Sequence, residues 1–244
     1  MRNKLLAVLL GGVVAGPTFG VACAAEPGAQ SGQQPATEAR TNAQNSDDLQ
    51  DALENVKEAV TVVRKMEGQQ DARQLLQRAK GVLIVPDYGR GAAVVGGSGG
   101  SGLLVVKHDG SWSDPVFYNL GSISVGAQAG VSAGQVAFLL MTDKAVNSFK
   151  GENNFSLNAD AGLTIVNYSA RGQASLGKGD IVFWSDTEGG YAGVSVSGSD
   201  ITVDNDANQA YYARSSVEPA AVLNGTITKT RPEASELKDA LPAA

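Results

Sequence analysis

Three glycines in the segment VVGGSGGSGLLVV, residues 94–106, have a spacing that could cradle a phosphate. Gly97, Gly99 and Gly102 fit the pattern G-x-G-x-x-G, which binds a pyrophosphate in dinucleotide-binding folds when a helix follows a strand. The sequence LLVVKHDGSW after Gly102 predicts a strand and a turn instead, and no Gly-Lys-Ser or Gly-Lys-Thr occurs in the chain. We therefore expect residues 96–102 to be a crossing where two strands approach closely.

Few other residues have the types and spacing that catalysis requires. His108 is the sole histidine and Cys23 the sole cysteine, so a Ser-His-Asp triad would depend on a turn residue and a zinc site would lack ligands. Asp200, Asp204 and Asp206 offer carboxylates for a cation or for acid–base catalysis, but the calcium-loop glycine is missing. We expect Asp204 or Asp206 to cap a short helix, and we expect no enzyme activity, no cofactor and no metal site.

Two helices are predicted ahead of the first strand, over about 46–68 and 71–79. Ser46 can cap the first, and its apolar residues recur at helical spacing: Leu49, Leu53, Val56, Val60 and Val63. The second should turn Leu75 and Leu76 inward. For both helices, packing of the apolar stripe on the domain's own sheet is favoured over insertion into a membrane.

After Gly81 the apolar period changes to two, which is typical of strands. GVLIVP, AAVV, GLLVVK, QVAFLLM, DIVFWS and YAGVSVSG are short strands separated by turn residues, and residues 123–133 and 155–165 alternate for longer. Small residues on both faces favour close packing or strong curvature. The fold class expected is α+β: a curved antiparallel β-sheet or partial barrel with two N-terminal helices and short flanking helices at 143–149 and 205–212.

The first residues have the layout of a secretory signal, and the sequence divides into four parts. Arg2 and Lys4 precede an apolar run, and Cys23 lies at the expected cleavage site, where it is either the lipidated first residue of a lipoprotein or is removed. We expect a signal peptide over 1–25, a flexible linker over 26–45, the folded domain over 46–215 and a helical extension over 216–244. The protein is expected to be exported, and to be periplasmic or lipid-anchored to the outer membrane.

The basic residues of an acidic chain gather in one stretch. Without Arg2 and Lys4 the chain has 17 basic and 25 acidic residues, yet residues 64–107 hold seven basic and three acidic ones. We expect these seven to form a patch that attracts anionic headgroups: Arg64, Lys65, Arg73, Arg78, Lys80, Arg90 and Lys107. An ordinary solvated helix face explains the same charges equally well.

Several segments together resemble the SYLF-domain family. They are RAKGVLIVPDYGRGAAVVGGSGGSGLLVV and, further along the chain, residues 110–117, 126–130, 191–196 and 206–212. The resemblance implies small non-enzymatic modules that bind membrane lipids; eukaryotic members prefer phosphoinositides and associate with actin regulators, and bacterial members are exported. Asn158 and Ala213 depart from the pattern, since glycine is usual at both places, which puts the local turn geometry in doubt.

These observations together predict noncatalytic binding of anionic phospholipid, with phosphoinositide-like or other acidic headgroups, at a bacterial cell envelope. The basic patch would hold the headgroup, and an apolar surface of the first helix or a strand edge would contact the acyl region. An acidic chain of this kind does not favour nucleic acid as a partner, and protein partners are unknown. Two alternatives stay open: an envelope structural or protein-interaction lipoprotein without specific lipid recognition, and a carboxylate-dependent envelope enzyme.

Overall fold

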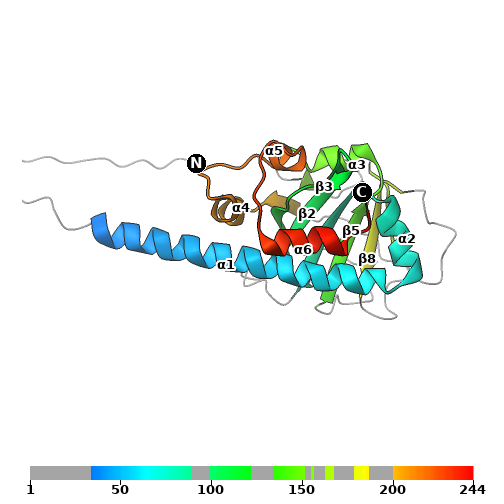
Figure 1. The fold of residues 1–244 in the computed structure, drawn as a ribbon, viewed down its shortest axis with the longest axis horizontal. Coiled ribbons are helices and arrows are strands. Elements are labelled where there is room, and N and C mark those ends of the chain that lie inside the picture. The colour runs from blue at the N-terminus through cyan, green and yellow to red at the C-terminus, as the bar shows by residue number, and fades with distance from the viewer. Residues whose placement is uncertain are drawn as a thin grey trace, which may run out of the picture.

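A computed structural model describes residues 34–89, 99–121, 134–151, 155–156, 163–167, 179–186 and 200–243. The helices are α1 (Gln34–Glu67), α2 (Gln70–Arg78), α3 (Asp143–Ser148), α4 (Asn205–Tyr212), α5 (Pro219–Leu223) and α6 (Pro232–Ala240). The strands are β1 (Gly81–Tyr88), β2 (Gly100–His108), β3 (Ser111–Trp112), β4 (Val116–Leu120), β5 (Gly134–Leu140), β6 (Phe155–Ser156), β7 (Ile165–Asn167), β8 (Ile181–Ser185) and β9 (Asp200–Val203). Figure 1 shows the long α1 running beside the sheet, with α6 lying along it.

The described strands form one curved, open sheet, so the α+β prediction is confirmed. Its order is β6-β9-β4-β2-β1-β5-β8-β7, with β3 paired to β2 alone. Every pairing is antiparallel except that of β7 with β8, which is parallel and differs from the antiparallel expectation. The central strands β1, β2 and β5 are buried over runs of four or more residues, because helices cover the sheet.

The glycine segment is a close approach of two strands, as its sequence predicted. A Cβ on Gly102 would lie 2.5 Å from the carbonyl oxygen of Ile84, and one on Gly100 would lie 2.8 Å from Val85 Cγ1. β2 then turns into β3 with no helix between them. The helix N-terminus that would meet a pyrophosphate is therefore missing at this point, while Gly97 lies outside the described residues.

Helix α1 begins at Gln34, twelve residues before the expected start at Ser46. The expected linker over 26–45 is therefore helical from residue 34 onward. Alanine, glutamine, glutamate and arginine in this stretch favour helix, and Pro35 is tolerated in a first turn. Figure 1 shows this part of α1 projecting beyond the sheet.

The apolar stripe of α1 packs into the domain core. Val56, Val60, Val63 and Met66 are each at most 3% exposed, and they belong to the same core cluster as β1, β2 and β5. This confirms the packing interpretation of the stripe. It also corrects one of the two expected sources of acyl contact, because the buried α1 stripe offers no apolar surface to a membrane, and the strand-edge alternative stays a prediction.

Both predicted short helices are present, and the cap at Asp204 is the one that the sequence predicted. Thr142 caps α3 by accepting from Ala145 N–H, and Asp204 caps α4 by accepting from Ala207 N–H at 3.0 Å. Ala213 ends α4 with φ +53°, the left-handed conformation for which the family uses glycine. The helices after residue 215 share the main core through Val222, Leu223, Leu237 and Leu241.

Several expectations lie outside the described residues: the signal peptide, Cys23, the strands AAVV and YAGVSVSG, the alternation over 123–133 and the departure at Asn158. Within the described ranges, no helix combines the length and the apolar character needed to cross a bilayer.

Candidate functional site

Three lysines are among the residues that line one hollow at the surface, near the end of the sheet where α2 leads into β1. Lys80 precedes β1, Lys107 lies near the end of β2 and Lys150 follows α3, and the hollow that they line has a volume of about 430 Å³. Asp109 and Asp143 are the carboxylates on its lining. With its histidine neutral, the lining carries one net positive charge. We call this feature the lysine hollow.

Pairing of β1 with β2 places Lys80 and Lys107 opposite one another. Lys107 N–H donates to the Lys80 carbonyl at 2.8 Å, and Lys80 N–H donates to the Leu140 carbonyl of β5 at 2.8 Å. Like charges directly opposite in an antiparallel pair repel each other, so separate acceptors must hold the two ammonium groups. Lys80 Nζ donates to Asp143 at 2.5 Å, whereas Lys107 Nζ donates to the Gln77 carbonyl at 2.9 Å.

Lys107 is held by groups that carry no formal charge. Gln77 lies in the last turn of α2, where helix carbonyls present partial negative charge, and the Trp112 ring centre lies 5.0 Å from Lys107 Nζ. Burial lowers the pKa of the Lys107 ammonium. Its ammonium thus has no carboxylate partner in these contacts, and it lies beside Gln77 and Trp112, neither of which lines the hollow.

Lys150 is the member of the hollow that sequence reasoning missed. Its Nζ donates to Asn224 Oδ1 at 2.8 Å, again a neutral acceptor, contributed by the end of α5. Lys150 is remote in sequence from the basic stretch over 64–107, and no local pattern marks it. Only the packing of α3 and α5 beside the β2–β3 turn brings it to the other lysines.

Three of the predicted basic residues pair with carboxylates and do not line the hollow. The pairs are Arg64 with Glu236 at 2.7 Å, Lys65 with Asp186 at 2.8 Å and Arg73 with Glu67 at 3.3 Å. Arg78 is exposed in the last turn of α2, and Arg90 and Cys23 lie outside the described residues. Of the seven predicted cations, the structure therefore brings only Lys80 and Lys107 together in this hollow.

His108 lies in the β2–β3 hairpin turn, as predicted. Asp109 and Gly110 have φ values of +49° and +77°, which suit a two-residue hairpin turn. His108 Nε2 lies 3.1 Å from Asp109 Oδ2, and the Ser111 hydroxyl donates to the His108 carbonyl at 3.2 Å. These are turn contacts and do not form a nucleophile–base–acid series.

Of the predicted carboxylates, Asp204 has a structural role. Asp204 caps α4 and also accepts from Asn119 Nδ2 at 3.0 Å, while Asp200 begins β9. Burial, followed by the nearby Asp206 and Asp204 carboxylates, raises the pKa of Asp48 on α1. In the part of the chain that the structure describes, no three His, Cys, Asp or Glu side chains are grouped to hold a metal ion.

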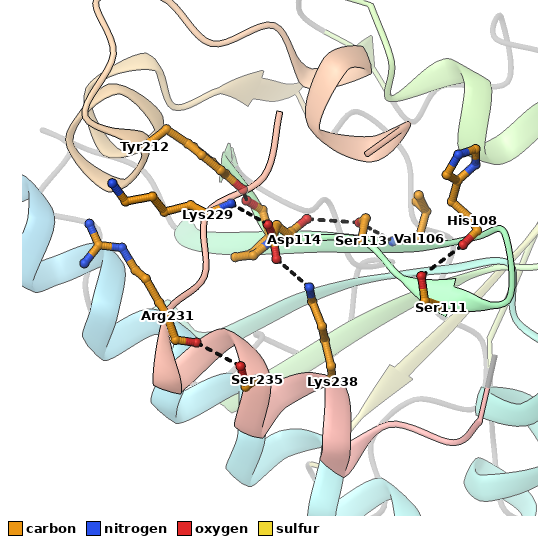
Figure 2. A network of polar contacts seen from close by, with 11 residues as sticks. Val106, His108, Ser111, Ser113, Asp114, Tyr212, Lys229, Arg231, Ser235 and Lys238 are labelled. Atoms are coloured by element: carbon orange, nitrogen blue, oxygen red, sulfur yellow. Dashed lines mark hydrogen bonds and ion pairs between the residues drawn. The ribbon is translucent and has the colours of Figure 1, made fainter. Parts of the chain in front are cut away.

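A buried aspartate joins the middle of the chain to its C-terminal segment. Asp114, 6% exposed, accepts from Lys238 Nζ of α6 at 2.5 Å and from Lys229 N–H at 2.7 Å (Figure 2). Nearby, Trp112 Nε1 donates to the Pro242 carbonyl at 2.8 Å. These contacts hold α6 against the sheet, and we call them the Asp114 clamp.

A comparison with known protein families identifies the family of this chain. Residues 121–244 match the Ysc84 family, described as "Las17-binding protein actin regulator". This chain belongs to the Ysc84 family, the family of the SYLF domain. The Asp114 clamp gives a physical role to residues 110–117, which the sequence resemblance had singled out and which precede the residues matched to the Ysc84 family.

Three eukaryotic proteins are among the curated relatives of this Ysc84-family chain. It is 33% identical to Protein YSC84 of Saccharomyces cerevisiae over 144 residues, which cover 57% of this chain and 31% of the yeast protein. An SH3 domain-containing protein of Schizosaccharomyces pombe is 33% identical over 161 residues, 64% of this chain and 37% of that protein. The human SH3 domain-containing YSC84-like protein 1 is 26% identical over 144 residues, 57% of this chain and 42% of that protein. The chain thus matches less than half the length of each of these relatives.

Proposed function

We propose that this Ysc84-family domain binds anionic phospholipid surfaces without transforming them, and that the lysine hollow is the part that meets the headgroups. The observation that carries the proposal is that Lys80, Lys107 and Lys150 lie around one hollow, and that neutral oxygens hold the ammonium groups of Lys107 and Lys150. Such groups keep their charge available to an anion, unlike Arg64, Lys65 and Arg73, which contact carboxylates. Because the α1 stripe is buried, the attraction proposed is electrostatic and sensitive to salt.

Vesicle co-sedimentation tests this function. Neutral phosphatidylcholine vesicles are compared with vesicles that also contain phosphatidylglycerol, at low salt and again at high salt. We expect recovery with the anionic vesicles only, and loss of it as salt rises. Equal recovery with both vesicle types, or with neither, would contradict the proposal.

A matched pair of double variants locates the binding surface. Lys107→Gln/Lys150→Gln removes two charges from the hollow, whereas Arg64→Gln/Lys65→Gln removes two charges from α1. We expect the first to lower recovery with anionic vesicles at least fivefold and the second to leave it nearly unchanged. Equal losses would show that net charge alone governs binding.

A protein partner is the second candidate, favoured by the description of the family as Las17-binding. The exposed face of α1 carries the acidic residues Asp47, Asp51, Glu54 and Glu58, so a basic partner segment would suit it. A pull-down with a basic peptide, in which an Asp47→Asn/Asp51→Asn variant loses binding, tests this candidate. Retained binding by that variant would rule out this face.

The cell-envelope setting is part of the same proposal and rests on the signal-like layout before residue 26. Expression of the full chain in a bacterium, followed by fractionation and mass spectrometry, tests it. Export predicts a shortened N-terminus, and a lipid on Cys23 predicts a mass increase that Cys23→Ser removes. An intact N-terminus in the cytoplasmic fraction would refute export.

A further inference from the structure

The acceptor that holds Lys150 belongs to an Asn-Gly pair at the end of α5. Asn224 ends the helix with φ −94° and ψ 5°, and Gly225 follows it with φ +73°. Both residues are exposed to solvent, and Lys150 Nζ donates to Asn224 Oδ1 at 2.8 Å. The neutral amide that holds the Lys150 ammonium is therefore open to water and lies next to a glycine.

Asn224-Gly225 is the only Asn-Gly pair in the sequence. In such a pair the main-chain nitrogen of the glycine attacks the side-chain carbonyl carbon of the asparagine, because glycine has no side chain to block the approach and its backbone turns freely. The product is a cyclic imide, which water opens to an acid. Every other asparagine of this chain precedes a residue whose side chain hinders the same attack.

Two local contacts act on this reaction in opposite directions. The Lys150 ammonium donates to Asn224 Oδ1, the oxygen on which negative charge develops during the attack, and a donor in that place stabilises the charge. Against the reaction, Gly225 N–H donates to the Val222 carbonyl at 2.9 Å, and this bond must open before the nitrogen can turn toward Asn224 Cγ. Helix α5 has five residues, and the ends of helices fray. The reaction therefore requires opening of one exposed turn and no unfolding of the core.

We propose that Asn224 is a site of spontaneous deamidation, and that the acid formed there weakens binding to anionic surfaces because it pairs with Lys150. The Gly225 nitrogen bonds to Asn224 Cγ while the bond from Cγ to the side-chain nitrogen breaks. That nitrogen leaves as ammonia and takes up the proton of Gly225 N–H. Water then adds to the cyclic imide and opens it to aspartate or isoaspartate. This inference rests on the proposed function and deepens it, since it names a covalent change that regulates the lysine hollow.

The modification changes the kind of acceptor that Lys150 meets. Before it, Lys150 Nζ contacts a neutral oxygen, whereas Lys80 Nζ already contacts the Asp143 carboxylate. After it, Lys150 also has a carboxylate partner, and one negative charge has been added beside the hollow. One charge near an anionic surface changes the affinity about fivefold, so the modified chain should bind about fivefold more weakly.

The first experiment follows the modification itself. The full chain is kept in mildly alkaline buffer, and peptide mapping by mass spectrometry measures the conversion of each asparagine over time. We expect Asn224 to convert about tenfold faster than Asn147, an exposed residue of α3 that Ser148 follows. Asn224→Gln is the control variant, because it keeps the amide but its side chain is too long to form the same ring. Conversion of Asn224 no faster than that of Asn147 would refute the site.

The second experiment measures the consequence with phosphatidylglycerol vesicles. We expect Asn224→Asp to lower recovery about fivefold, and to lower it less when Lys150→Gln is also present. Asn45→Asp is the matched control, since it adds the same charge at an exposed position of α1 and should leave recovery unchanged. Wild type that has been aged in the first experiment should lose recovery, whereas aged Asn224→Gln should keep it.

The outcomes keep the two proposals apart. Equal losses from Asn224→Asp and Asn45→Asp would overturn the regulatory inference, because net charge alone would then explain them. Unchanged recovery with Asn224→Asp, while wild type binds anionic vesicles, would also overturn it and leave the proposed function standing. Rapid conversion of Asn224 in a chain that binds no anionic vesicles would support the modification site and refute the proposed function.

Discussion

Replacement of Asp114 by asparagine should destabilise the domain severely, because this carboxylate is buried and accepts two strong hydrogen bonds. Its partners are Lys238 Nζ at 2.5 Å and Lys229 N–H at 2.7 Å. Hydrogen bonds to a charged group contribute about 1.5–3 kcal/mol each, and breaking a buried ion pair costs about 3–5 kcal/mol. Lys238 is 34% exposed and can regain water, so we place the loss near the lower end, at about 3 kcal/mol.

Urea unfolding at neutral pH measures this loss, and thermal unfolding should show a melting temperature lower by about 6–12 °C. A double-mutant cycle with Lys238→Met isolates the pair. Once Lys238 is gone, Asp114→Asn should cost less than in the wild type, with a coupling free energy of about 1–2 kcal/mol. A loss below about 0.5 kcal/mol for Asp114→Asn, or additive losses in the cycle, would refute the argument that the clamp holds the C-terminal segment.

Substitutions at four other positions should change the stability of the domain by different amounts. Gly102→Ala forces a Cβ to within 2.5 Å of the Ile84 carbonyl oxygen, so urea unfolding should show a loss of about 3 kcal/mol. Asn208→Leu should lose about as much in the same assay, about 3 kcal/mol, because the buried Asn208 amide makes three hydrogen bonds to the main chain. Hydrogen bonds from a main-chain N–H and a threonine hydroxyl lower the pKa of Asp180, so this group stabilises the fold above its unfolded value of 3.8 and ceases to do so as the pH falls through the folded value. The stability difference between wild type and Asp180→Asn, measured by urea unfolding, should therefore narrow as the pH falls below about 4. Arg64→Gln breaks an exposed pair, so it should change stability by less than about 0.5 kcal/mol and leave vesicle recovery unchanged.

Local signals in the sequence predicted the elements of the fold that depend on neighbouring residues. The helical period of Val56, Val60 and Val63, the hairpin turn after His108 and the cap at Asp204 each act within a few residues, and the structure confirms all three. The early start of α1 was missed because a polar stretch rich in alanine and glutamine has helix propensity without an apolar stripe. Composition alone therefore favoured a linker there.

Contacts between residues that are far apart in the sequence could not be predicted from local sequence patterns. The lysine hollow depends on Lys150, and the Asp114 clamp depends on Lys238, each more than forty positions from its counterpart. The charge count over 64–107 named seven cations, but it could not tell Arg64, which has a carboxylate partner, from Lys107, which has a carbonyl partner. Which acceptor each cation meets is decided by tertiary packing.

The Asp114 clamp has a consequence for the order of events during synthesis. Trp112 and Asp114 emerge from the ribosome long before residues 229–242, yet these late residues supply their partners. The part of the core that Leu237 and Leu241 cover therefore stays exposed to solvent until that segment has been synthesised. A nascent chain with exposed apolar surface is prone to aggregation, so we expect this chain to be vulnerable until residues 229–242 have been synthesised.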